Sequence, residues 1–198
     1  MAGPALKLGF QRPVQDSQAV FRQVMMAMAR PGSIHALTVP LDAPAGLSAA
    51  SAATALALCD FETPIWLDQD LAADEGVTGF LRFHTGAPQV NDPAAAQFAF
   101  LPRGAQWPSF EAFCVGTLAY PDRSTTLVAE VASLSSEGGW TLAGPGIAGA
   151  ARLAAEGLPA DMLDRLAGNR SLFPRGVDIV LTCGDRLSAL PRSIVVEG

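Results

Sequence analysis

Apolar residues recur at helical spacing near the start of the chain. Four of them fall at intervals of one, three and four residues: Val20, Phe21, Val24 and Met28. Polar residues fill the opposite side, so the pattern predicts an amphipathic helix with one face packed on a sheet or a partner. We expect this helix to begin at Asp16, whose carboxylate can accept from the free amides of a first turn, and to end before residues 30–32.

Short apolar runs and helical stretches alternate through the next part of the chain. The pattern predicts strands at 33–39, 63–67 and 98–101, helices at 47–59 and 71–83, and a turn of helix at 108–113. Further on, residues 125–134 read as a long strand that returns through Gly138-Gly139 into an antiparallel strand at 140–143. Pro159 and Gly168-Asn169 mark the two ends of a late helix.

The stretch 173–192 reads as one β-hairpin around Gly184-Asp185. Glycine at the first loop position supplies the positive φ of a tight type II′ turn. Asp178 shares its strand face with apolar neighbours, so its carboxylate needs a partner. The open ends of a hairpin lie side by side, so Arg175, Asp178 and Arg192 can meet, and an internal salt bridge is the default interpretation.

Helices interleaved with strands, followed by hairpins, predict an α/β protein. We expect a three-layer α/β/α sandwich with a mixed sheet. The chain has 198 residues, and a chain of this size buries about 70% of its unfolded surface around one core. We therefore expect a single domain over residues 1–198.

The composition indicates a covered apolar surface. Hydrophobic residues make up 49% of the chain and charged residues only 16%, which predicts an obligate partner or a dimer. The net charge of -6 opposes binding to nucleic acid, because contacts to phosphates need clustered Lys and Arg.

The cysteines and the hydropathy pattern favour the cytoplasm. The number of cysteines is odd and they lie far apart in the sequence: Cys59, Cys114 and Cys183. This pattern is typical of buried free thiols in a reducing compartment. Lys7 interrupts any apolar run near the start, so we expect no secretory signal. The longest uncharged run, 43–59, is too short and too weakly apolar to span a bilayer.

Several kinds of chemistry lack their residues in this sequence. Lys7 is the only lysine, which argues against Schiff-base chemistry and a pyridoxal phosphate cofactor. The two histidines and three cysteines have no metal-ligand spacing, so we expect no metal. Residues 144–149 match G-x-G-x-x-G but lack the helix and acidic residue of a dinucleotide fold, so they read as a strand-ending turn. No P-loop motif is present.

One local cluster could form a polar site. Arg82, His84 and Thr85 combine a cation, a titratable ring and a hydroxyl at a helix-to-loop junction. One interpretation is contact with an anion. The other is that His84 hydrogen-bonds a carbonyl or carboxylate and fixes the loop before Pro88.

Several segments, in order, resemble the PhnH family of subunits of the bacterial carbon-phosphorus lyase core complex. They are Pro13-Val14-Gln15-Asp16 with Phe21-Arg22, Arg30-Pro31-Gly32, Thr63-Pro64-Ile65-Trp66-Leu67, Leu81-Arg82-Phe83-His84-Thr85, Gly144-Pro145-Gly146-Ile147, and the hairpin from Phe173-Pro174 to Pro191-Arg192. The resemblance covers nearly the whole chain. It assigns no catalytic residue, because the family offers none to transfer.

The resemblance implies a fold similar to the large domain of pyridoxal-phosphate-dependent transferases, without that cofactor. It also implies a homodimer in isolation and assembly with PhnG, PhnI and PhnJ. The complex attaches an alkylphosphonate to ribose triphosphate, using ATP, and a radical iron-sulfur subunit then cleaves the carbon-phosphorus bond. The chain would be an accessory subunit with no active site of its own; the alternative is a stand-alone enzyme that binds a nucleotide or phosphate.

Overall fold

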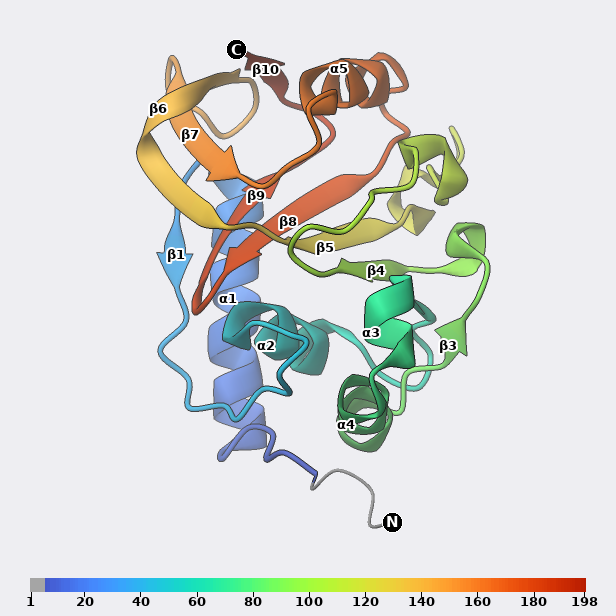
Figure 1. Cartoon of the computed structure of the whole chain (residues 1–198). Coiled ribbons are helices and arrows are strands. Elements are labelled where there is room, and N and C mark those ends of the chain that lie inside the picture. The colour runs from blue at the N-terminus through green and yellow to red at the C-terminus, as the bar shows by residue number, and fades with distance from the viewer. Residues whose placement is uncertain (1–5) are drawn as a thin grey trace.

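A mixed sheet of seven strands forms the centre of the computed structural model, which describes residues 6–198 (Figure 1). Its strand order is β1-β9-β8-β5-β4-β2-β3. The bounds are β1 (His35–Ala36), β2 (Ile65–Leu67), β3 (Gln89–Val90), β4 (Phe98–Leu101), β5 (Thr126–Glu130), β8 (Asp178–Cys183) and β9 (Arg186–Leu190). The strands from β8 to β3 in this order run parallel to one another. β9 pairs antiparallel with β8, and β1 pairs antiparallel with β9. The predicted mixed sheet is therefore confirmed.

Four helices cover one face of this sheet, on the side occupied by α2, α3 and α4 in Figure 1. They are α1 (Pro13–Ala29), α2 (Ala49–Leu58), α3 (Gln69–Ala73) and α4 (Glu75–Thr85). Phe100, Val128 and Val180 point to this side from neighbouring central strands and are fully or almost fully buried. Four alanines of α2 have almost no exposed surface, and their small size lets the helix approach the sheet closely: Ala50, Ala52, Ala53 and Ala55.

The other face is covered differently from the prediction. A smaller antiparallel sheet, with the order β10-β6-β7, lies there together with α5. Its elements are β6 (Ser133–Ala143), β7 (Ala151–Glu156), α5 (Met162–Ser171) and β10 (Val195–Glu197). Leu134, Leu142 and Leu153 of the small sheet join Ile179 and Leu181 of β8 in this second part of the core. The layers are therefore helices, sheet, and a second sheet with one helix, rather than helices on both faces.

The predicted hairpin of residues 125–134 with 140–143 is wrong. β5 ends at Glu130, and β6 runs on through the Gly138-Gly139 segment, which bulges, so that β6 pairs with β7. A Cβ on Gly139, at φ 65°, would lie 2.4 Å from the carbonyl oxygen of Leu153, so only glycine fits there. Residues 144–149 lie between the antiparallel strands β6 and β7, as the strand-ending-turn interpretation predicted.

Three helix predictions also need correction. The late helix between Pro159 and Gly168-Asn169 is α5, which begins at Met162 and continues to Ser171. α1 begins at Pro13, and Asp16 lies within its first turn. The predicted helix over 71–83 is two helices, because Asp74 ends α3 and its carboxylate accepts from the backbone amides of Gly76 and Val77 at the start of α4. Phe21, placed on the core-facing stripe, is 48% exposed.

The terminal hairpin is confirmed. β8 and β9 pair antiparallel around the turn, and Gly184 has φ 61°. β8 lies between β5 and β9, and it contributes residues to both parts of the core.

Candidate functional site

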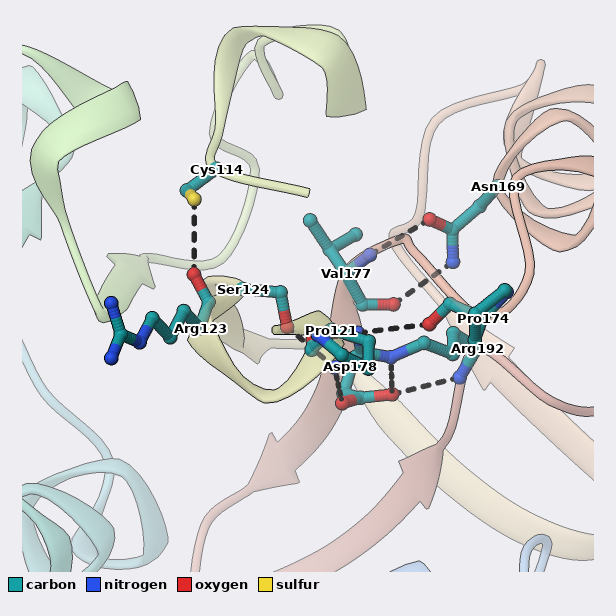
Figure 2. A network of polar contacts seen from close by, with 9 residues as sticks. All are labelled: Cys114, Pro121, Arg123, Ser124, Asn169, Pro174, Val177, Asp178 and Arg192. Carbon is teal, nitrogen blue, oxygen red and sulfur yellow. Dashed lines mark hydrogen bonds and ion pairs between the residues drawn. The ribbon is translucent and has the colours of Figure 1, made fainter. Parts of the chain in front are cut away.

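Arg192 lies at the centre of a polar network at the open end of the β8–β9 hairpin (Figure 2). Its guanidinium is paired with the carboxylate of Asp178, and it also donates to the hydroxyl of Ser124. One terminal nitrogen donates to the carbonyl of Pro121 at 2.6 Å, and the backbone amide of Arg192 donates to Asp178 at 2.8 Å. The predicted pairing of Asp178 with Arg192 is confirmed.

This network joins three separate parts of the chain. Asp178 begins β8, Arg192 follows β9, and Pro121 and Ser124 come from the segment that leads into β5. The side chains of Arg192 and Asp178 are only 13% and 21% exposed. Almost every donor in the network is therefore directed at the protein's own acceptors, which leaves few groups free to hold a ligand.

Arg175 does not join Asp178 in this network. Its Nε atom is buried and has no hydrogen-bond partner among residues 6–198. The predicted meeting of three residues is thus reduced to the pair of Asp178 and Arg192.

Asn169 is a buried polar residue that sequence reasoning did not single out. Its side-chain amide donates to the carbonyl of Val177 at 2.9 Å and accepts from the Val177 backbone amide at 2.8 Å, as Figure 2 shows. These two bonds tie the end of α5 to the residue before β8. The only signal in the sequence was its position in the Gly168-Asn169 helix stop, which marked an end and not a contact.

The Arg82, His84 and Thr85 cluster does not converge on one point. His84 Nε2 lies 2.9 Å from the backbone carbonyl oxygen of Lys7, so the ring donates to the segment before α1. Thr85 donates to the carbonyl of Leu81 and accepts from the amide of Ala87. The carbonyl-binding interpretation of His84 is correct, although the segment it holds is the one at Lys7 and not the loop before Pro88.

Arg82 and His84 also face different cavities. Arg82 lines a cavity of about 370 Å³ beside β2 and the residues after α4. His84 lines a larger, open groove of about 800 Å³. That groove lies among the segment before α1, the first half of α1 and the end of α2, and its walls are mainly apolar: Leu8, Phe10, Val14, Phe21, Leu56 and Ala57.

His35 occupies a different polar contact, between α1 and β1. Its Nδ1 lies 2.9 Å from Oε1 of Gln23, and its Nε2 lies 2.8 Å from Oγ of Ser33. Burial lowers the pKa of His35, and the nearby positive charge of Arg30 lowers it further. The neutral ring is therefore favoured in the folded chain.

The remaining reactive groups are separated from one another. Burial, with a contribution from Asp60, raises the pKa of Cys59 to about 12, so this thiol stays protonated. Lys7 is paired with Asp42 at the surface, at 3.2 Å. Within residues 6–198, no three His, Cys, Asp or Glu side chains gather as a metal site would require. Among the same residues, no helix combines the length and the hydropathy needed to cross a membrane.

Comparison with known proteins places this mixed α/β chain among the bacterial phosphonate metabolism proteins. Residues 8–197 match the family model described as "Bacterial phosphonate metabolism protein (PhnH)". The chain is 45% identical over 190 residues to the "Alpha-D-ribose 1-methylphosphonate 5-triphosphate synthase subunit PhnH" of Rhizobium meliloti (strain 1021), and this match covers 95% of the chain and 94% of the relative. The chain belongs to the PhnH family, as the resemblance of its segments indicated.

Proposed function

We propose that this chain is an accessory subunit of the carbon-phosphorus lyase core complex in the breakdown of organophosphonates. The observation that carries the proposal is the 45% identity, over 95% of the chain, to a protein named as a subunit of ribose 1-methylphosphonate 5-triphosphate synthase. An alignment of that extent leaves no large part of the chain without a counterpart in that relative.

The partners in this proposal are PhnG, PhnI and PhnJ. The assembled complex forms ribose 1-methylphosphonate 5-triphosphate from ATP and an alkylphosphonate, and the reactive groups come from the other subunits. In their absence the chain forms a homodimer in the cytoplasm. The exposed apolar side chains on α1 support a role in assembly, because an uncovered apolar surface on a protein in water marks an interaction site.

The polar residues support an accessory role more than a catalytic one. Asp178, Arg192 and Thr85 bind the protein's own backbone and side chains, and His84 holds the carbonyl of Lys7. We propose that these residues, with Arg175, maintain local structure. Lys7 lies before α1, away from the sheet, which agrees with a fold related to pyridoxal-phosphate-dependent transferases that has no amine for the cofactor.

Co-expression with PhnG, PhnI and PhnJ tests the proposal. We expect the four chains to elute together in size-exclusion chromatography and the isolated chain to give no heat in titrations with ATP, NAD, pyridoxal phosphate or methylphosphonate. Micromolar binding of any of these compounds to the isolated chain, or turnover without companions, would instead favour a stand-alone enzyme.

A further inference from the structure

Helix α1 is apolar on two opposite sides. Val20, Val24 and Ala27 are buried against the sheet. On the other side, Val14, Phe21 and Met25 are 75%, 48% and 53% exposed. A helix of a protein that worked alone would carry polar residues on this outer side.

The outer side has the spacing of a helix-packing seam. Val14, Gln18, Phe21 and Met25 follow one another at intervals of four, three and four residues, which is the a/d pattern that lines up along a second helix. We call these four residues the outer seam. Three of them, Val14, Gln18 and Phe21, also line the open groove of about 800 Å³, so the seam and the groove form one continuous surface.

The exposed charge beside the outer seam is positive. Arg22 follows Phe21 on α1 and is exposed, whereas Arg12 is paired with Asp16 and Arg30 lines a different cavity after the end of the helix. The only carboxylate of the helix, Asp16, is 1% exposed and accepts from Arg12. Near the groove, the carboxylate of Asp42 is already paired with Lys7. The chain as a whole carries a net charge of -6, so the exposed Arg22 gives the seam a positive flank on an acidic protein.

We propose that the outer seam and groove bind a helix of another subunit of the complex, one with an apolar face flanked by carboxylates. The exposed Arg22 guanidinium beside the seam attracts such a helix. A second copy of this chain, placed about a two-fold axis, would instead bring the Arg22 side chains of both copies to the same contact, where they repel. This inference rests on the proposed function and names the surface that it uses.

The test compares the effect on assembly of replacing exposed apolar residues in the outer seam with the effect of replacing exposed apolar residues elsewhere on the surface. In the complex co-expressed with PhnG, PhnI and PhnJ, replacing the seam by the double variant Phe21→Ser/Met25→Ser should weaken assembly by about tenfold or more, measured by titration of tagged chain against the three-subunit complex. The matched control Leu118→Ser/Phe173→Ser removes two residues that are 75% and 52% exposed elsewhere on the surface and should leave affinity within about twofold. Circular dichroism and the denaturation midpoint verify that each variant is folded.

Charge variants test the chemistry of the partner. Arg22→Glu should weaken assembly and reduce its salt dependence, whereas Arg123→Glu, at the distant η3 turn (Pro121–Arg123), should do neither. Equal losses at both positions would overturn the charge argument.

Three outcomes overturn the proposal. The first is unchanged assembly of the Phe21→Ser/Met25→Ser variant. The second is that this variant converts a dimer of the isolated chain to a monomer and leaves assembly with the other subunits unchanged, which would mean that the seam binds a second copy of the chain. The third is binding of the chain to anionic phospholipid vesicles that the same variant abolishes. Failure of the wild-type chain to assemble with any subunit would instead contradict the proposed function itself.

Discussion

At the scale of single residues, Arg192 shows how a guanidinium can close one end of a hairpin. Its donors reach a carboxylate on β8 and a hydroxyl and a backbone carbonyl on the segment before β5, so removing the carboxylate leaves a mostly buried cation without its counter-charge. Asp178 is the acceptor that takes the most of these bonds.

The variant Asp178→Ala should lower the free energy of unfolding by about 1–3 kcal/mol, because it strands the Arg192 guanidinium in a site where it is 13% exposed. Urea denaturation measures the change. Asp42→Ala is the control, since the Lys7–Asp42 pair is about half exposed on both sides and its loss should cost less than about 1 kcal/mol. Equal midpoints for Asp178→Ala and the wild type would contradict the structural role.

His35 should make stability depend on pH. Its pKa in the folded chain is lowered from 6.5 by burial and by Arg30, so the unfolded chain takes up the proton first as the pH falls. The contribution of neutral His35 is therefore complete above pH 6.5 and is lost as the pH falls through the folded pKa. Between about pH 8 and pH 5.5 the denaturation midpoint of the wild type should fall more than that of His35→Gln. Parallel curves for the two proteins would refute this.

Sequence reasoning at this scale succeeded where a chemical need was local. A carboxylate on an apolar strand face required a cation, and the hairpin brought Arg192 to Asp178. Sequence reasoning did not find Asn169, because the role of Asn169 depends on its two hydrogen bonds to the backbone of Val177. Only the folded structure brings these two residues together. The type of contact made by His84, a hydrogen bond to a carbonyl, was predicted correctly. The residue that supplies this carbonyl was not, since Lys7 is 77 residues away in the sequence.

At the scale of elements, α1 explains why its stripe was misjudged. Apolar residues on both sides of a helix give a periodic pattern, but the pattern does not say which side meets the sheet. Phe21 was therefore assigned to the core although Val20 and Val24 beside it fill that role. The start of the helix was misplaced for a related reason: Asp16 accepts one backbone amide, that of Arg12, and it does so from inside the helix rather than as its cap.

The variant Asp16→Ala should destabilise the chain by about 1–3 kcal/mol, because the Arg12 amide loses its acceptor and a side chain that is 1% exposed leaves a gap. Thermal denaturation followed by circular dichroism measures the loss. Arg12→Gln is the matched control: it keeps the Arg12 backbone amide on the Asp16 carboxylate and a side-chain amide that can donate to it, so it should cost less than Asp16→Ala. A larger loss in the control than in Asp16→Ala would show that the side-chain pair matters more than the backbone contact.

The strands were predicted well where the local sequence pattern was sufficient, and badly where the answer depended on which sheet a strand belongs to. β4 was predicted at the bounds that it has, and β8 and β9 form the predicted hairpin. The break between β5 and β6 was missed because the apolar run continues across it, while the two strands belong to different sheets. β3 and β10, of two and three residues, carry too little pattern to be read without their neighbours.

At the scale of the whole molecule, the central sheet separates two parts of one core. Helices α1 to α4 pack on one side, and the small sheet with α5 packs on the other. Alternate residues of β8 reach both sides, which is the reason to expect the chain to unfold as a single unit.

Single-unit unfolding has a direct test, because Trp66, Trp107 and Trp140 all belong to the side of the small sheet. Phe100→Ala, on the helix side, should lower stability by about 3–5 kcal/mol and shift the transition seen by tryptophan fluorescence as much as that seen by circular dichroism. Leu181→Ala, on the tryptophan side, is the companion variant and should give the same coincidence with a loss of about 2–5 kcal/mol. Transitions that separate in either variant would contradict a single domain.

The position of β8 also affects how this protein can be made in a cell. The strand is surrounded by β5 and β9 near the middle of the sheet, yet it is built from residues 178–183 of a chain of 198. During synthesis the edge of β5, made of residues 126–130, stays open to pairing with other chains until residues 178–183 have been made and have formed β8. A fragment that ends before residue 178 should therefore aggregate, and a chaperone would have the most to protect in the interval between the synthesis of β5 and that of β8.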